Sequence, residues 1–186
     1  MGFCHRHIGP HGAGRRKLDL GPTVLQATGT ARAYHDAPLS SYKLPLSVLV
    51  VIHTANLRVL LLERAQRPGY WQSVTGSLDR PDEPLEVAAA REVKEETGID
   101  AAAGRLARWN LANTFEIYLQ WRHRFAPGVT HNTEHVFGLE LPEALPVTIA
   151  PEEHTAFGWL PWREAAERCF SWSNRDAIRV LGENAP

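Results

Sequence analysis

One segment, from Gly76 to Ile99, constrains this chain more than any other, because a helical pattern there carries densely placed carboxylates. Glu92, Glu95 and Glu96 stand at positions i, i+3 and i+4, which share one face of a helix. Like charges at this spacing repel, so such a helix loses stability unless a cation lies among them. A hard dication such as Mg²⁺ prefers oxygen ligands and bridges readily to phosphate oxygens. A solvated acidic surface is the alternative that three glutamates alone do not exclude.

The same segment holds signals that begin and end a helix. Pro84 suits the first helical turn, with Asp82 or Glu83 as N-cap candidates. Gly76 and Gly98 bracket the segment, where the chain needs a permissive backbone to enter and leave the helix. The sequence therefore predicts a helix from about residue 84 to residue 97.

A wider pattern surrounds the glutamates: a glycine, a glutamate seven residues later, and then Arg-Glu-aliphatic-x-Glu-Glu-x-Gly-aliphatic. This pattern resembles the Nudix box, the signature of hydrolases that cleave nucleoside diphosphates linked to another moiety. The family has five residues between the first glycine and the first glutamate, whereas six (SLDRPD) stand here, in a loop that tolerates insertion. Arg91 lies four residues before Glu95 and is expected to pair with it. The matching residues are Gly76, Glu83, Arg91, Glu92, Glu95, Glu96 and Gly98.

Segments outside the box narrow the resemblance to a folate-pathway subfamily, the bacterial dihydroneopterin triphosphate pyrophosphatases. The similarity extends roughly from Tyr42 to the C-terminus, and mutator-type nucleotide hydrolases usually have a Gly-Gly entry to the box that is absent here. The segments that carry it are Tyr42-Lys43, Tyr70 to Ser77, Phe115 to Ile117, Arg122 to Thr130, Asn132 to Glu134 and Ser171 to Arg175.

The resemblance implies roles for particular residues. The metal ligands for Mg²⁺, or alternatively Mn²⁺, would be Glu92, Glu96 and the distal Glu153, for which the adjacent Glu152 could substitute. The catalytic residues would be Glu95, Glu92, Arg91 and Glu153. The phosphate chain would be contacted by Lys43 and Arg64, although either could be an ordinary charge at a strand end. The other substrate contacts would come from Thr75, Phe115, Glu116, Ile117, Tyr118 and Ser171.

The pterin ring of such a substrate explains some of these residue types. An amino group and a ring N–H lie side by side on its edge, so one carboxylate can accept both, and Glu116 is the candidate. Guanine presents the same edge, so Glu116 cannot separate a pterin from a guanine nucleotide. Trp71, Phe115 or Trp172 could stack on the flat ring, although a place in the core is the commoner fate of such residues.

The order of the remaining elements indicates the fold. Leu44 to Ile52 is a nearly continuous apolar run, as expected for a strand buried on both faces. Ser173 is the expected N-cap of the last helix and Gly182 lies beyond its predicted end. Mixed strands and helices predict an α/β protein, and the resemblance implies an α/β/α sandwich with a mixed sheet and a loop-helix-loop catalytic motif. The other expected strands are 58–64, 71–75, 106–111, 114–121, 134–141 and 154–160, and the other helix is 161–169.

Length and charge bound the remaining possibilities. Residues 41–186 are expected to form one domain, preceded by a flexible extension over residues 1–40 whose Cys4 and histidines offer a less favoured soft-metal site. The net charge of −1 gives no argument for binding a nucleic-acid polymer. Cys4 and Cys169 form no disulfide or metal pattern, and no apolar run could span a membrane, so a cytoplasmic protein is expected. The sequence leaves the oligomeric state open.

The function expected from the resemblance is Mg²⁺-dependent hydrolysis of a small-molecule triphosphate, dihydroneopterin triphosphate, to the monophosphate and pyrophosphate in folate synthesis. A (deoxy)nucleoside triphosphate pyrophosphohydrolase acting on dATP or oxidised guanine nucleotides would use the same chemistry. A non-catalytic sensor of the same fold is a third possibility, but such a protein can lose the box carboxylates, and all three are present here.

Overall fold

The computed structural model describes residues 42–184 of the chain. The expected flexible extension over residues 1–40, and with it the alternative metal site near Cys4, lie outside the described residues. Strand β1 (Leu46–Thr54) runs through the interior, and its residues 47–54 are all buried. Val48, Val50 and Ile52 pack on one face of the sheet, whereas Leu49 and Val51 pack on the other. The continuous apolar run therefore belongs to a strand covered on both sides, as predicted.

The sheet has seven strands and is mixed. Strand order is β3-β2-β1-β6-β5, with β4 also pairing with β1 and β7 with β2. β1 and β6 are parallel, with Leu46 opposite Thr133, and the other pairs are antiparallel. The remaining strands are β2 (Arg58–Arg64), β3 (Trp71–Gln72), β4 (Val74–Ser77), β5 (Arg105–Glu116), β6 (His131–Leu141) and β7 (His154–Pro161).

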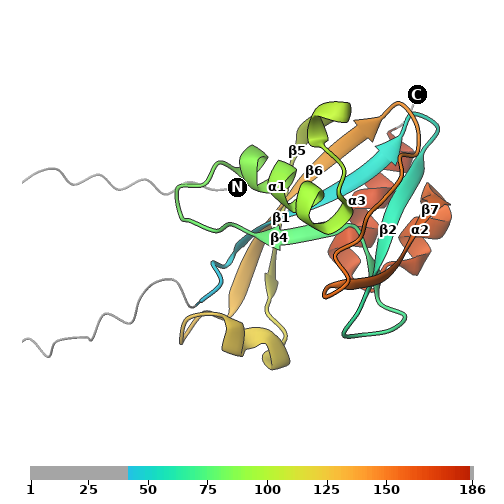
Figure 1. The fold of residues 1–186 in the computed structure, drawn as a ribbon. Helices are drawn as coiled ribbons and strands as arrows, with labels where there is room; N and C mark the ends of the chain where they lie inside the picture. Colours follow the sequence, from blue (N-terminus) through green and yellow to red (C-terminus); the bar gives the residue numbers. More distant parts are fainter. Residues whose placement is uncertain (1–41, 185–186) are drawn as a thin grey trace, which may run out of the picture. The chain divides into compact units, whose positions relative to one another are not determined.

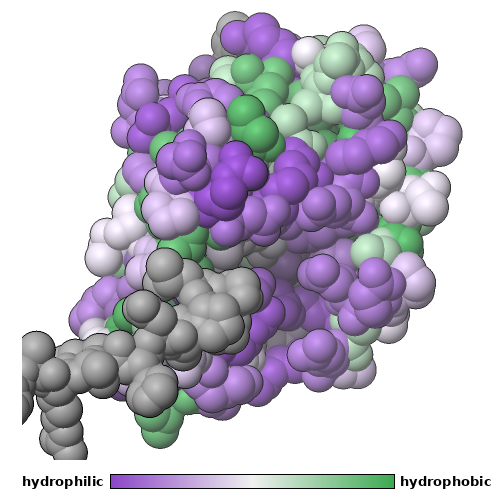
Figure 2. All heavy atoms as spheres, turned by 60° about the vertical axis from the view of Figure 1, so that its left-hand side comes forward, coloured by the Kyte–Doolittle hydropathy of each residue, from purple (hydrophilic) through white to green (hydrophobic). Residues whose placement is uncertain are grey.

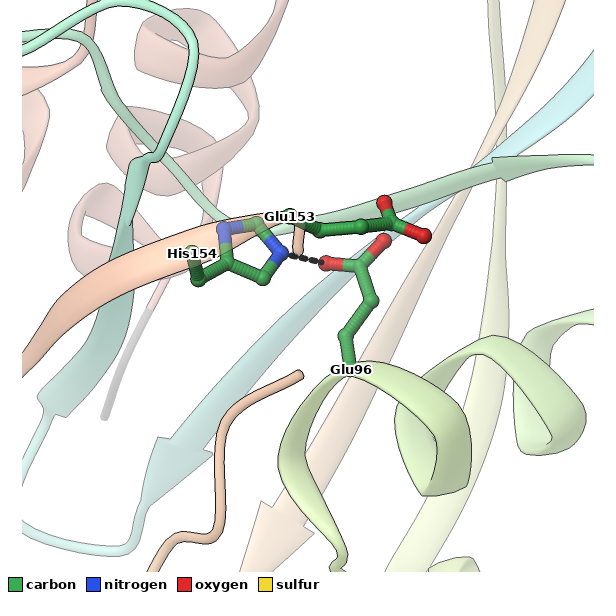
Figure 3. Close-up of side chains that lie close together, drawn as sticks. All are labelled: Glu96, Glu153 and His154. Atoms are coloured by element: carbon green, nitrogen blue, oxygen red, sulfur yellow. Dashed lines mark hydrogen bonds and ion pairs between the residues drawn. The ribbon is translucent and has the colours of Figure 1, made fainter. Parts of the chain in front are cut away.

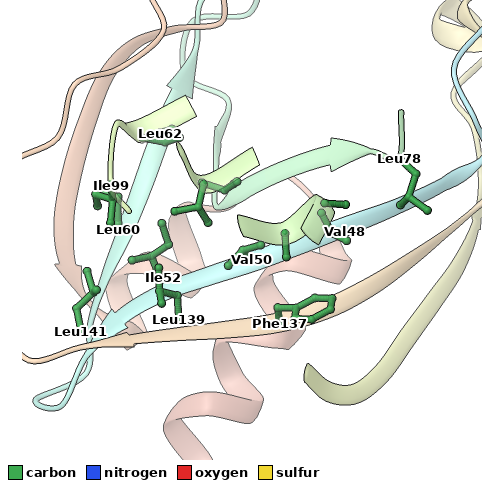
Figure 4. Close-up of a cluster of buried hydrophobic side chains, with 14 residues drawn as sticks. Val48, Val50, Ile52, Leu60, Leu62, Leu78, Ile99, Phe137, Leu139 and Leu141 are labelled. Atoms are coloured by element: carbon green, nitrogen blue, oxygen red, sulfur yellow. The ribbon is translucent and has the colours of Figure 1, made fainter. Parts of the chain in front are cut away.

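Helices cover both faces of this sheet (Figure 1). Helix α1 (Leu85–Thr97) places Ala88, Ala89 and Val93 on the cluster that contains Val48 and Phe137, which is drawn in Figure 4. Helices α2 (Trp162–Arg168) and α3 (Trp172–Glu183) pack on the opposite face, against the cluster that contains Leu49 and Val51. The expected α/β/α sandwich is therefore confirmed. Within residues 42–184, no helix is long and apolar enough to cross a membrane.

Three details differ from the sequence-based expectation. The strands expected at 106–111 and 114–121 are one strand, β5, whose pairing with β6 is interrupted between Arg108 and Ala112, where Asn110 has a positive φ of 53°. The segment Leu119–Arg124 is a 3-10 helix, η3, and Ala101–Ala103 is another, η2. The N-cap of helix α3 lies two residues earlier than expected, at Ser171 and not Ser173, and the helix continues through Gly182.

Candidate active site

Arg91 organises the carboxylates of α1. Its guanidinium donates hydrogen bonds to Glu92 at 2.8 Å, to Glu95 at 3.1 Å and to Glu83 at 3.0 Å. It also donates to the main-chain oxygen of Ser77 in β4 at 3.1 Å. One cation therefore offsets the repulsion between these carboxylates and ties the helix to the neighbouring strand. The pairing of Arg91 with Glu95 was expected, and the structure confirms it.

Glu83 closes the loop that precedes α1 and does not cap the helix. The N-cap residue is Pro84, without a side-chain cap, so the expectation that Asp82 or Glu83 would cap the helix was wrong. The Glu83 carboxylate is buried and accepts the N–H of Asp79 at 2.7 Å as well as the Arg91 bonds. Its hydrogen bond with Arg91 lowers the pKa of Glu83.

The two glycines of the segment have different roles. Gly98 adopts a left-handed conformation with φ of 71° and ends α1, as expected. Gly76 needs no unusual backbone and lies in β4, opposite Val48. A Cβ atom at Gly76 would lie 1.7 Å from Cδ of Glu92. The absent side chain therefore makes room for this carboxylate between helix and strand.

Three ligand-type side chains meet where α1 faces the start of β7 (Figure 3). Glu96, Glu153 and His154 each offer one atom, and these atoms lie within 4.8 Å of one another. Glu96 is buried and accepts a hydrogen bond from Nε2 of His154 at 2.8 Å and one from the N–H of Thr75 at 3.3 Å. Burial raises the pKa of Glu96, and the bond from His154 acts in the opposite direction.

The donor chemistry of this place fits a divalent cation. Glu96 and the exposed Glu153 present carboxylate oxygens, which hard cations prefer. His154 directs Nε2 at Glu96, so its hydrogen bond orients that carboxylate, as the hydrogen-bond partners of metal ligands commonly do. Glu92 is not among the three clustered residues, but it lines the same hollow as Glu95 and Glu153. Burial raises the pKa of Glu92 to about 7 against the lowering effect of Arg91.

Three cations border the cluster. Lys43 and Arg64, expected at the phosphate chain, line one hollow together with Arg124 and Glu153. Arg124 is close enough to repel the charges of Lys43 and Arg64, and its main-chain oxygen accepts the N–H of Lys43 at 2.8 Å. Arg124 was not predicted as a site residue, although its segment carried part of the resemblance. A bound polyanion would relieve the repulsion among these cations.

A larger cavity of about 760 Å³ lies beside the cations. A hydrophilic, hollowed face is visible in Figure 2. The cavity shares Arg64, Thr75 and Ile117 with a smaller hollow that reaches Lys43 and Glu153, so the two form one cleft. The predicted substrate residues that line the larger cavity are Arg64, Thr75, Phe115, Glu116, Ile117, Tyr118 and Ser171.

The polar residues of this cavity are connected in different ways. Arg64 donates to Gln72 at 2.8 Å, and Gln72 donates to Thr75 at 3.1 Å, which fixes two predicted substrate residues relative to each other. Glu116 has a side chain that is 67% exposed and forms an ion pair with Arg122. Ser171 caps α3 by accepting the N–H of Asn174 at 3.3 Å, so its hydroxyl hydrogen remains available to a ligand.

Glu134 is a cavity residue that the sequence-based assignment missed as a site. It lies in β6, is only 6% exposed and lines both hollows of the cleft. Within residues 42–184, one of its carboxylate oxygens, Oε1, has no hydrogen-bond partner, and the same is true of Oδ1 of the buried Asn132 two residues earlier. Burial raises the pKa of Glu134 to about 7, while a hydrogen bond with Ser173 lowers it. Its segment, Asn132 to Glu134, carried part of the resemblance, but no recognisable spacing marks a buried carboxylate in a strand as a site residue.

The buried Glu134 predicts a pH dependence of stability. Its pKa is about 7 in the folded protein against 4.5 as the ordinary value, so the unfolded chain ionises first as pH rises. Native stability is therefore lost between about pH 4.5 and pH 7 at this site. We expect Glu134→Gln to raise the free energy of unfolding by ~2 kcal/mol more at pH 8 than at pH 5, measured by urea unfolding.

A surface variant on the same strand controls for the loss of one charge. Glu140 pairs with Arg105, and its hydrogen bond with Arg105 lowers its pKa, so Glu140→Gln should not increase stability at pH 8. An equal effect of Glu134→Gln at both pH values would contradict the raised pKa of Glu134.

Comparisons with known proteins agree with this geometry. The NUDIX domain model matches residues 43–181. The dihydroneopterin triphosphate diphosphatase of Escherichia coli strain K12 is 47% identical over 147 residues, which are 77% of this chain and 96% of the relative. The enzyme of the same name from Haemophilus influenzae is 38% identical over 145 residues, which are 76% of this chain and 89% of that relative. The solved structure of the E. coli dihydroneopterin triphosphate pyrophosphohydrolase has a TM-score of 0.71 at 46% identity, covering 77% of this chain and 99% of that one.

Proposed function

The chain belongs to the NUDIX domain family, and from this premise we propose that it hydrolyses dihydroneopterin triphosphate to dihydroneopterin monophosphate and pyrophosphate. This reaction would place it in folate synthesis. The proposal agrees with the names of relatives that the chain matches over 96% and 89% of their length. The matched region also includes every residue assigned here to the metal, the phosphates and the ring.

One observation carries the proposal: a single cleft joins an acidic end, a cationic middle and an aromatic end. Glu153 and the cations Lys43 and Arg64 line its smaller hollow, next to Glu96. Phe115 lines both hollows and Trp172 the larger one, so flat side chains stand where a bicyclic ring would follow a triphosphate. The cleft therefore combines the chemistries that a metal-bound triphosphate with a pterin ring requires.

The chain's own residues prepare the reaction by holding the substrate. Glu96 and Glu153, with Glu92, would hold Mg²⁺, which when bound polarises the phosphoryl group and lowers the pKa of water. Lys43, Arg64 and Arg124 neutralise the phosphate oxygens and align the α-phosphorus for in-line attack. Because Arg91 and Gly76 fix the place of Glu92, the carboxylate is positioned before substrate arrives.

The step itself exchanges one bond at phosphorus. The oxygen of water bonds to the α-phosphorus, the bond from that phosphorus to the α,β-bridging oxygen breaks, and pyrophosphate leaves with that oxygen. A carboxylate at the hollow accepts the proton of the water, and Glu95 and Glu153 are the two candidates there. Glu95 is oriented by Arg91 and is not part of the metal cluster, so we assign the proton to Glu95.

A substrate panel tests the proposal. The purified protein is incubated with Mg²⁺ and separately with dihydroneopterin triphosphate, dATP, dGTP and 8-oxo-dGTP, and pyrophosphate and orthophosphate release are measured. We expect pyrophosphate release with the highest kcat/KM for the pterin, since specificity is a ratio of these values. A higher kcat/KM for a nucleotide would replace the proposal by the nucleotide pyrophosphohydrolase alternative. No Mg²⁺-dependent hydrolysis of any of the four would support the ligand-binding sensor.

A further inference from the structure

We propose that Glu134, together with Asn132, binds the hydrogen-bond donor edge of the substrate's ring and thereby selects rings that carry this edge, such as a pterin, over rings that lack it, such as adenine. The inference rests on the proposed function, whose reaction it deepens by naming the residues that determine specificity. From the sequence, the exposed Glu116 was expected to bind the ring edge. We assign this role instead to the buried carboxylate of Glu134 in the wall of the cleft.

The position of the two side chains carries the proposal. Asn132 and Glu134 are two residues apart in β6, so they project from the same face of the sheet. Both are 6% exposed, and both line the smaller hollow of the cleft. Nδ2 of Asn132 donates one hydrogen bond to Ser47 at 2.7 Å, which fixes the orientation of the amide and leaves its oxygen without a partner among residues 42–184.

The free groups are both hydrogen-bond acceptors. Oδ1 of Asn132 and Oε1 of Glu134 have no partner within the described part of the chain. Buried polar atoms in native proteins are nearly always satisfied, and these two belong to residues that line the cleft, so we infer that their partner is a ligand donor that reaches them there. Burial raises the pKa of this carboxylate, and among the described residues no cation pairs with it, so without a ligand its burial would only destabilise the fold.

The ring of a pterin supplies the matching donors. Its 2-amino group and the adjacent ring N–H lie side by side and can reach a carboxylate and a neighbouring amide oxygen together. Guanine has the same edge, whereas adenine presents a ring nitrogen that accepts where the pterin donates. A site built to pair with such donors rejects a ring without them, because its buried oxygens would remain unpaired.

Glu116 is less suited to this role. Its side chain is 67% exposed at the mouth of the cavity, where Arg122 already occupies an oxygen. A hydrogen bond to an exposed group exchanges with water and contributes little discrimination. Glu134 lines the same hollow as Phe115, so stacking on the ring and pairing with its edge would occur together.

The test compares substrates in the variant Glu134→Gln. Glutamine keeps the shape of the side chain but has only one acceptor and a donor that faces the donors of the ring. We expect kcat/KM for dihydroneopterin triphosphate to fall at least ~30-fold more than kcat/KM for dATP, the range expected for hydrogen bonds to a charged group. Glu140→Gln is the matched control, because Glu140 lies in the same strand and its carboxylate pairs with Arg105. This variant should change kcat/KM for neither dihydroneopterin triphosphate nor dATP. Losses for the two substrates that agree within threefold would overturn the proposal.

A binding measurement keeps the test independent of catalysis and of folding differences. Binding of 7,8-dihydroneopterin and of its N3-methyl analogue, which lacks one donor, is measured by fluorescence with the wild-type protein and with Glu134→Gln. We expect the methyl group to weaken binding about tenfold or more in the wild type and much less in the variant. If the methyl group weakens binding tenfold in both proteins, a residue other than Glu134 binds the donor edge of the ring.

The outcomes separate this inference from the proposed function. If the wild type prefers dihydroneopterin triphosphate but Glu134→Gln loses no selectivity, the function stands and the inference fails. If the wild type prefers a guanine nucleotide, the same variant is compared on dGTP and dATP. A selective loss for dGTP would then support the reading of the donor edge by Glu134 while the pterin assignment fails.

Discussion

Glu96→Gln is expected to lower kcat by roughly 10²-fold or more while the protein keeps its fold. The amide keeps the size of the carboxylate but removes the negative charge and one of the two oxygens that a divalent cation would use. Glu96 is the most buried member of the acidic cluster and is held by both His154 and the N–H of Thr75. Its burial already raises its pKa, so the loss of the charge should not destabilise the protein.

The measurement is a pair of values on the purified variant: kcat at saturating substrate over a range of Mg²⁺, and the midpoint of thermal unfolding. We also expect the Mg²⁺ concentration for half-maximal activity to rise. Glu86→Gln is the matched control, because Glu86 is an exposed glutamate in the first turn of the same helix. A folded Glu96→Gln protein with near wild-type turnover would remove Glu96 from the metal site.

Gly76→Ala should reduce kcat by about 10²-fold through a displacement of Glu92, since a misplacement of 1 Å can have this effect. The added Cβ would lie 1.7 Å from Cδ and 1.9 Å from Oε1 of Glu92, so this side chain must move. The side chain is flexible, and the backbone of Gly76 does not have a positive φ. We therefore expect a change in the free energy of unfolding of no more than ~1 kcal/mol.

A double-mutant cycle distinguishes this mechanism from a general disturbance of the strand. If the methyl group acts only by moving Glu92, the double variant with Glu92→Gln should be no slower than Glu92→Gln alone. Gly158→Ala is a strand-glycine control, because its Cβ would meet no atom closer than 3.9 Å and φ there is not positive. Additive losses in kcat would show that Gly76 acts independently of Glu92.

The sequence predicted those parts of the protein that depend on local pattern. The spacing of Glu92, Glu95 and Glu96 placed them on one helix, and the apolar run of β1 indicated a strand with two covered faces. The order of the elements indicated an α/β protein, and the family resemblance implied the sandwich. The assignment of residues to metal and substrate came from the family resemblance, and it stays a prediction until variants are measured.

The parts that depend on contacts between distant segments could not be read from the sequence. His154 and Glu96 are 58 positions apart in the chain, and no sequence pattern predicts their contact. The acceptors of Asn132 and Glu134 are recognisable only because burial and missing partners are visible in three dimensions. The cap of α3 at Ser171 was missed because Ser173 is an equally good N-cap by type, and only the start of the helix decides between them.

The pairing of β1 with β6 has a consequence for how the protein is made. Leu46 lies opposite Thr133, so β1 leaves the ribosome long before its parallel neighbour exists. β2 and β4 can pair with β1 earlier, but its other edge stays open until residues 131–141 have been synthesised. At about 5–20 residues per second this apolar strand waits for several seconds with an unpaired edge. Slow translation between residues 54 and 131 would therefore favour aggregation, and chaperone capture should be strongest for nascent chains that end within this interval.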